Sequence, residues 1–77
     1  MFYVYCLKSL KTNKLYVGFT NNLRRRFEEH NAKSGGDFTA KNGPWKLIFY
    51  EAHINESDAR EMEIFYKSGY GREVLQG

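Results

Sequence analysis

The sequence lacks most of the features that mark secreted and membrane-bound proteins. Cys6 is its one cysteine, so no disulfide can form within the chain, and a small domain that folds without disulfides is typical of a reducing compartment. No apolar run approaches the roughly 20 residues that a transmembrane helix needs, and no signal peptide precedes the first strand-like segment. We therefore expect a cytoplasmic protein that does not associate with a membrane.

Aromatic and basic residues are what the sequence has in quantity. Hydrophobic residues make up 42% of the chain and aromatic residues 17%, which favours a folded domain over a disordered segment. A chain of 77 residues can bury one small core, so we expect residues 1–77 to form a single domain. The net charge of +3 permits a nucleic-acid partner but does not require one.

Three segments predict β-strands. Residues 2–8 and 15–19 are rich in β-branched and aromatic side chains, and residues 45–51 have the same character. The first two strands are joined by a predicted turn at residues 11–14. If this connection preserves the pleat alternation, one face carries Phe2, Val4, Cys6, Leu15 and Val17, and the opposite face carries Tyr3, Tyr5, Leu7, Tyr16 and Gly18. The first face is then an apolar core, and the second holds two phenols beside a glycine.

Two helices are predicted. The first is capped by one of residues 20–22 and runs to about residue 30, and the second runs from about residue 59 to residue 67. Residues 31–44 predict a loop long enough to bind a ligand, and the glycines beyond residue 67 are expected to leave a basic, flexible end. The order strand, strand, helix, strand, helix indicates an α+β fold in which helices flank a small three-stranded antiparallel sheet.

Helix periodicity assigns faces to the charged residues. In the first helix, Leu23 and Phe27 form the buried stripe, and Arg26 and His30 lie on its flank. The charged side chains that are expected to face outward are Arg24, Arg25, Glu28 and Glu29. In the second helix, Glu63 lies on or beside an apolar stripe of Ala59, Met62 and Tyr66. A carboxylate in that position needs an explanation beyond solvation.

The most informative pattern is the spacing of two tyrosines, a glycine, an arginine and a histidine. Ten residues separate Tyr5 from Tyr16, and Gly18, Arg26 and His30 follow. Side chains of these types can converge on one anion, and phosphodiester cleavage has a use for each. Plainer interpretations are cross-strand packing, a strand end, surface ion pairs and a helix-dipole partner. The functional interpretation is favoured because the plainer one requires several coincidences at once.

In their order and spacing, these motifs resemble the GIY-YIG nuclease family. The similarity is best to its short stand-alone bacterial members, and it extends to the N-terminal nuclease domain of the bacterial excision-repair enzyme. The two name-giving motifs correspond to residues 3–5 (Tyr-Val-Tyr) and 16–18 (Tyr-Val-Gly). The family's helix arginine falls on Arg26, and its metal-binding glutamate falls on Glu63, four residues before Lys67. The resemblance covers nearly the whole chain.

The resemblance implies a metal-dependent endonuclease that hydrolyses phosphodiester bonds in DNA, with a role in repair or in processing branched or damaged DNA. It implies one divalent ion, Mg²⁺ or Mn²⁺, held by Glu63 with phosphate oxygens and water. The implied catalytic residues are Tyr5, Tyr16, Arg26, His30 and Glu63. The expected substrate-binding residues are Gly18, Arg24, Arg25 and Lys67. Because a chain this small covers little of a duplex, a protein partner or a homodimer is expected to supply any sequence specificity.

Each implied role has a chemical reason. Arg26 offers a planar fork of donors that matches two phosphate oxygens and neutralises developing charge. Tyr5 is the candidate for orienting or deprotonating the attacking water, although a free phenol has a pKa of about 10 and needs nearby cations to ionise. Tyr16 is expected to bind the phosphate or the water, and His30 to accept or relay the proton. The sequence leaves open which of the three is the general base.

Two other interpretations stay open. One is a nucleic-acid-binding module on the same fold that has lost catalysis, which is favoured by the absence of any asparagine after Glu63, where several active family members carry one. The other is a small protein-interaction domain that uses exposed aromatic side chains. Metal-dependent nicking separates the nuclease from the first alternative, and salt-dependent DNA binding separates it from the second.

Overall fold

A computed structural model describes residues 1–31 and 41–76 of the chain. Its elements, in chain order, are β1 (Phe2–Ser9), β2 (Leu15–Thr20), α1 (Leu23–Asn31), β3 (Trp45–His53), α3 (Glu56–Lys67) and α4 (Gly69–Gln76). This order confirms the predicted α+β fold and adds a further helix at the C-terminal end. The predicted loop at 31–44 falls mostly outside the described residues, and Asn31 at its start belongs to α1.

The three strands form one antiparallel sheet in the order β2-β1-β3, with β1 in the centre. Tyr5 lies opposite Gly18 and Leu7 lies opposite Tyr16, so the predicted alternation of faces is confirmed. The register between β1 and β3 shifts between Cys6 and Leu7. Because β2 is an edge strand, side chains from both layers of helices can meet beside it.

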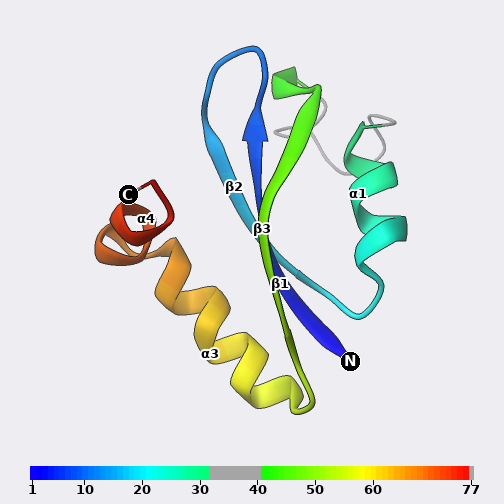
Figure 1. Ribbon diagram of the computed structural model, residues 1–77, viewed down its shortest axis with the longest axis vertical. Helices are drawn as coiled ribbons and strands as arrows, with labels where there is room; N and C mark the ends of the chain where they lie inside the picture. The colour runs from blue at the N-terminus through cyan, green and yellow to red at the C-terminus, as the bar shows by residue number, and fades with distance from the viewer. Residues whose placement is uncertain (32–40, 77) are drawn as a thin grey trace.

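Helices cover both faces of the sheet. Figure 1 shows α1 on one side and α3 with α4 on the other. The predicted apolar face packs against α3 and α4 in a core built on Val4, Cys6, Leu15, Val17, Ala59 and Tyr66. The tyrosine face is also covered, because Tyr5, Leu7 and Trp45 form a second cluster against which Leu23 and Phe27 of α1 pack. The expectation of a single apolar face was therefore incomplete, since four consecutive residues of β1 are buried.

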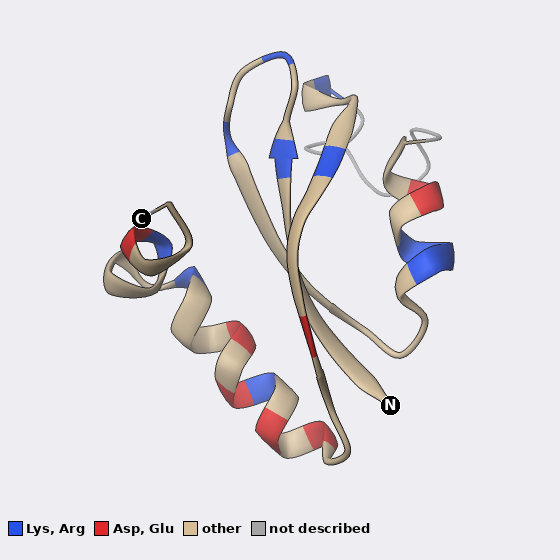
Figure 2. Ribbon diagram, viewed as in Figure 1, with Lys and Arg blue, Asp and Glu red and all other residues tan. Residues whose placement is uncertain are grey.

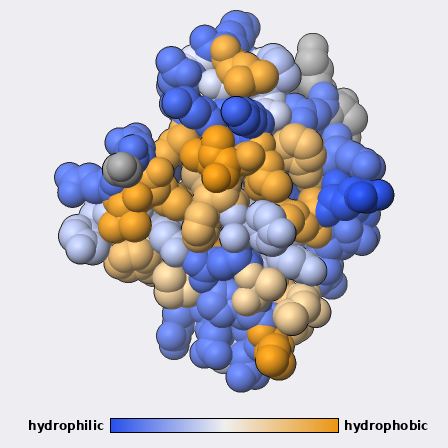
Figure 3. Space-filling view, in the orientation of Figure 1, coloured by the Kyte–Doolittle hydropathy of each residue, from blue (hydrophilic) through white to orange (hydrophobic). Residues whose placement is uncertain are grey.

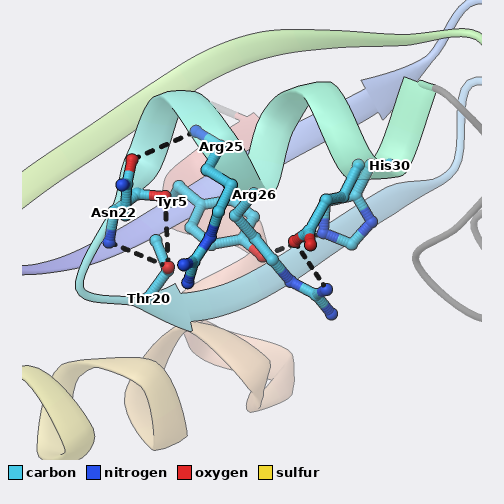
Figure 4. A network of polar contacts seen from close by, with 7 residues as sticks. Tyr5, Thr20, Asn22, Arg25, Arg26 and His30 are labelled. Atoms are coloured by element: carbon cyan, nitrogen blue, oxygen red, sulfur yellow. Dashed lines mark hydrogen bonds and ion pairs between the residues drawn. The ribbon is translucent and has the colours of Figure 1, made fainter.

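The first helix begins as its sequence predicts. The Oδ1 atom of Asn22 accepts a hydrogen bond from the backbone N–H of Arg25 at 3.1 Å, which caps an otherwise unpaired amide. The Oγ1 atom of Thr20 accepts one from the backbone N–H of Asn22 at 3.0 Å. Figure 4 shows this network at the start of α1. It fixes the first turn and thereby the direction in which the arginines of α1 leave the helix.

The second predicted helix starts earlier than expected. It was predicted from about residue 59, but α3 begins at Glu56, directly after Asn55 in extended conformation. Glu56 and Asp58 lie in the first turn, where negative charge is favoured by the helix dipole. Residues 56–58, which precede the predicted start, are therefore helical.

The expected flexible C-terminal end is wrong, because α4 forms there. Ser68 is extended and ends α3, and its Oγ atom accepts a hydrogen bond from the backbone N–H of Gly71 at 3.1 Å, which starts the new helix. A Cβ atom on Gly71 would lie 2.0 Å from the backbone oxygen of Phe65. This glycine therefore allows close packing of α4 on α3 and does not act as a helix breaker.

Charge is distributed unevenly over the molecule. In Figure 2, basic residues lie on the first part of α1, around the turn between β1 and β2 and on β3, whereas acidic residues alternate with basic ones along α3. The acidic side chains of α3 are Glu56, Asp58, Glu61 and Glu63. Figure 3 shows hydrophobic residues over the middle of the face viewed, surrounded by hydrophilic ones. None of the helices in the described part of the chain is long and apolar enough to cross a membrane.

Candidate functional site

A buried tyrosine and histidine form the centre of the candidate site. The hydroxyl of Tyr5 on β1 lies 2.9 Å from Nε2 of His30 on α1, and which group donates depends on the histidine tautomer. Tyr5 is 1% exposed and His30 is fully buried. In Figure 4 the Tyr5 ring points toward His30 beneath α1. Nδ1 of His30 has no partner among the described residues, so the Tyr5 contact is the one hydrogen bond described for this ring.

Burial shifts both groups away from their charged forms. Burial, with the neighbouring Tyr16, raises the pKa of Tyr5 to about 12, and the guanidinium of Arg26 opposes this rise. Burial, with the positive charge of Arg26, lowers the pKa of His30 to about 4. At neutral pH the pair is therefore a neutral phenol beside a neutral imidazole, which makes His30 a proton acceptor rather than a cation.

Tyr16 and Gly18 complete the β2 side of this centre. The Tyr16 ring meets the His30 ring edge-on at 5.0 Å between centroids, and it lies 6.4 Å from the Tyr5 ring. A Cβ atom on Gly18 would lie 2.3 Å from the Tyr5 hydroxyl oxygen. Gly18 was expected among the substrate-binding residues, and on this face of the sheet the space beside it is occupied by the Tyr5 phenol. The geometry thus gives Gly18 a different effect, which is to admit the phenol.

Arg26 lies between the buried pair and solvent. Its side chain is 31% exposed, and Nη1 lies 3.4 Å from Oε1 of Glu29. Hydrogen bonding to Tyr5 and to Glu29 raises the pKa of Arg26 although its partial burial acts in the opposite direction. Glu29, which was expected to face outward, is therefore turned toward Arg26. The guanidinium is positioned to exchange this carboxylate for another anion.

Glu63 approaches from the opposite layer of the fold. Its side chain on α3 is 16% exposed, and its two oxygens lie 2.9 Å from Nζ of Lys67 and 4.0 Å from Nη1 of Arg60. The charge of Glu63 contributes to the raised pKa of Tyr5, so the two side chains are within electrostatic reach. We call the group of Tyr5, Tyr16, Arg26, His30 and Glu63 the β2-edge site, because its members come together around this edge strand.

The expected substrate-binding residues lie at different places. Arg24 and Arg25 are exposed on α1, and Arg24 lines a cavity on the side of the helix that faces β3. Lys67 is half exposed at the end of α3 and pairs with Glu63. The structure therefore brings Lys67 next to the candidate metal ligand and separates it from Arg24.

Arg60 is a residue that the sequence did not single out. Its guanidinium lies 4.1 Å from the centroid of the Phe19 ring on β2, in cation–π geometry. It also pairs with Glu56 at 3.7 Å and with Glu63. The signal was present as charges spaced three or four apart on α3, at Glu56, Arg60, Glu63 and Lys67. That spacing places them on one helix face, but only the packing shows that this face lies along β2.

Comparisons with known proteins agree with this arrangement. Residues 1–76 match the model of the GIY-YIG catalytic domain. UPF0213 protein CPE1444 of Clostridium perfringens is 40% identical over 76 residues, which cover 99% of this chain and 81% of that protein. UPF0213 protein OB0043 of Oceanobacillus iheyensis is 36% identical over 84% of this chain and 74% of its own length.

A solved structure is similar as well. The solution NMR structure of UPF0213 protein BH0048 from Bacillus halodurans is 31% identical in sequence and superposes with a TM-score of 0.58. The match covers 97% of this chain and 82% of that one. The chain belongs to the GIY-YIG family, in which its similarity is to the UPF0213 proteins.

Proposed function

We propose that this protein is an endonuclease that hydrolyses phosphodiester bonds in DNA at the β2-edge site. The observation that carries the proposal is the Tyr5 hydroxyl held 2.9 Å from a neutral, buried His30, with Arg26 and Glu63 close enough to change the pKa of the phenol. A packing tyrosine does not need this set of neighbours. A proton-transfer centre does, because a phenol becomes a useful base only when another group can take its proton.

In the proposed reaction, an oxygen of water attacks phosphorus while one phosphorus–oxygen ester bond breaks, and the departing oxygen takes up a proton from solvent, to which His30 later returns its own. Tyr5 takes the proton of the water and passes its own proton to Nε2 of His30, so no free phenolate has to form. The low pKa of His30 opposes this transfer in the free protein, and a phosphate bound nearby raises that pKa because it favours the imidazolium.

Arg26 and Tyr16 are the proposed phosphate contacts. Arg26 is partly exposed, and its ion pair with a surface carboxylate is a 3.4 Å contact, so it can turn to the phosphate at little cost. Its fork of donors then stabilises the charge that develops on the non-bridging oxygens. Tyr16 lies between His30 and Trp45, where its ring can hold the reacting group against the buried pair.

Glu63 is the proposed ligand of a single divalent ion. Both of its oxygens already face positive charge, from Lys67 and Arg60, and the described residues contain no cluster of three or more potential ligands. An ion that Glu63 alone holds would complete its shell with phosphate oxygens and water, as Mg²⁺ does. When bound, such an ion supplies electrophilic assistance to the phosphate and to the leaving oxygen.

The test is nicking of supercoiled plasmid in Mg²⁺, in Mn²⁺ and in EDTA. We expect nicked circles with a metal, none in EDTA, and loss of nicking in Glu63→Ala. Glu61→Ala is the matched control, because Glu61 is an exposed carboxylate on the same helix, and it should cleave like the parent. If Glu63→Ala keeps full metal-dependent activity, the metal-ligand assignment is wrong.

The phenols are tested in the same assay. Tyr5→Phe and Tyr16→Phe preserve the packed rings and should lose most cleavage, whereas Tyr70→Phe on α4, where Tyr70 is 69% exposed, should not. If both variants cleave like the parent, the two hydroxyls take no part in the reaction.

A second candidate is a nucleic-acid-binding module without catalysis. The observation that favours it is the near-complete burial of Tyr5 and His30, since a water molecule must reach the phenol before it can be deprotonated. This candidate predicts salt-dependent DNA binding in the absence of any metal-dependent nicking.

A further inference from the structure

A second polar and aromatic site lies on the other flank of α1. Six residues line a cavity of about 390 Å³ between the start of α1 and the strands β1 and β3: Tyr3, Asn21, Asn22, Leu23, Arg24 and Tyr50. We call it the α1–β3 pocket. It shares no residue with the β2-edge site.

Two tyrosines give this pocket an exposed aromatic wall. Tyr50 is 55% exposed, and its ring lies 6.3 Å from that of Tyr3, with 58° between the ring planes. The pairing of Tyr50 with Tyr5 across β1 and β3 places it on the same sheet face as Tyr3. A tyrosine this exposed gains little from burial, so its ring face is available to stack on a flat ligand.

The charge of the pocket is of one sign. Arg24 is exposed and lines the pocket, and the other lining residues that the structure describes are neutral. Exposed Arg25 lies next in sequence, so a second cation is near. An arginine beside an aromatic platform is the combination that binds a phosphate and its base together.

We propose that the α1–β3 pocket binds one unpaired nucleotide of a nucleic-acid strand, with its base stacked on Tyr50 and its phosphate against Arg24. The cavity of about 390 Å³ falls in the range of about 300–1,000 Å³ that single small ligands occupy. The nucleotide must be unpaired, because both faces of a base within a duplex are already stacked on neighbouring bases.

This assignment names a substrate class for the β2-edge site. Tyr5 of that site pairs directly with Tyr50 of the pocket, so the two sites lie on the same face of the sheet, on either flank of α1. The preferred ligands are then nucleic acids that have a single-stranded segment next to the cleaved bond, such as flaps and single-stranded tails. The inference rests on the proposed function only in taking the ligand to be a nucleic acid.

The test is binding in EDTA, where no metal-dependent cleavage can occur. A fluorescein-labelled 12-nucleotide single strand and a blunt hairpin duplex are titrated by anisotropy against the parent protein. We expect the parent to prefer the single strand, and Tyr50→Ala to raise the Kd for that strand by about tenfold or more, as loss of one base stack does. Tyr50→Phe, which keeps the ring face, should stay within about twofold of the parent. Tyr70→Ala, at an even more exposed ring on α4, should bind like the parent.

The proposal is overturned if Tyr50→Ala and Tyr70→Ala bind the single strand equally well. It is also overturned if Tyr50→Ala weakens binding of the single strand and of the hairpin by the same factor. Should Tyr50→Ala not fold, the ¹⁵N-labelled parent is titrated with the same single strand, and the amides of Tyr3, Arg24 and Tyr50 should shift. Amide shifts confined to other residues would show that the strand binds elsewhere on the protein, and they would also overturn the proposal. Single-strand binding in EDTA that Tyr50→Ala weakens, together with no plasmid nicking by the parent in Mg²⁺ or Mn²⁺, would refute the nuclease proposal and leave this one standing.

Discussion

Gly18→Ala is the substitution for which the structure predicts the largest effect from the smallest chemical change. The new Cβ atom would lie 2.3 Å from the Tyr5 hydroxyl oxygen and 2.4 Å from its Cζ atom. Non-bonded carbon atoms rest at about 3.5–4.0 Å, so the phenol must move by about 1 Å. That displacement breaks the 2.9 Å hydrogen bond to His30, because hydrogen bonds longer than about 3.2 Å are weak.

The expected cost combines two effects. Overpacking a close-packed site costs about 1–3 kcal/mol, and the lost hydrogen bond costs about 0.5–1.5 kcal/mol. We therefore expect Gly18→Ala to lower the free energy of unfolding by about 1.5–4.5 kcal/mol, measured by urea denaturation followed by circular dichroism. The matched control is Gly69→Ala, because a Cβ atom on Gly69 meets nothing within 4 Å.

A double-mutant cycle isolates the contact. Tyr5→Leu removes the hydroxyl and the outer ring carbons that the new methyl group would meet. In that background, Gly18→Ala should cost less than about 0.5 kcal/mol, since sites in contact are strongly non-additive. A cost that is unchanged in the Tyr5→Leu background, or below about 0.5 kcal/mol in the parent, would refute the reasoning that Gly18 exists to admit the phenol.

Two further predictions concern charge. Because the pKa of His30 is lowered to about 4 in the folded protein, the unfolded chain takes up a proton on this histidine as the pH falls below about 6.5, whereas the folded chain does not. The resulting stability is present above pH 6.5 and is lost as the pH falls toward 4, by about 3 kcal/mol at most. The urea midpoint of the parent should therefore fall as the pH is lowered across this range. An equal fall in His30→Gln would show that His30 is not the cause. Arg26→Ala should lower turnover by about 100- to 1,000-fold, whereas Arg25→Ala should weaken binding and reduce its salt dependence. Equal losses of turnover in both variants would show that Arg26 has no special position.

The periodicities of the sequence were enough to determine the sheet faces and the sides of α1. Alternation along β1 and β2 put Tyr5, Tyr16 and Gly18 on one face, and the register bears this out. A spacing of four placed Arg26 and His30 on the flank of the stripe formed by Leu23 and Phe27, and the structure buries His30 there. These features are local, since a strand or a helix fixes the direction of each side chain relative to its neighbours.

Only the tertiary structure decided which surfaces meet. The sequence could not show that Tyr5 is buried or that its phenol occupies the space of Gly18, because burial depends on α1 crossing that face. Nor could it show that Glu63 and Arg60 lie along β2, or that Tyr3 and Tyr50 share a pocket with Arg24. These residues belong to elements far apart in the chain, and their proximity follows from how the layers pack, which local periodicity does not encode. For the same reason the glycines after Lys67 suggested a flexible end, whereas contact between α3 and α4 orders that segment as a helix.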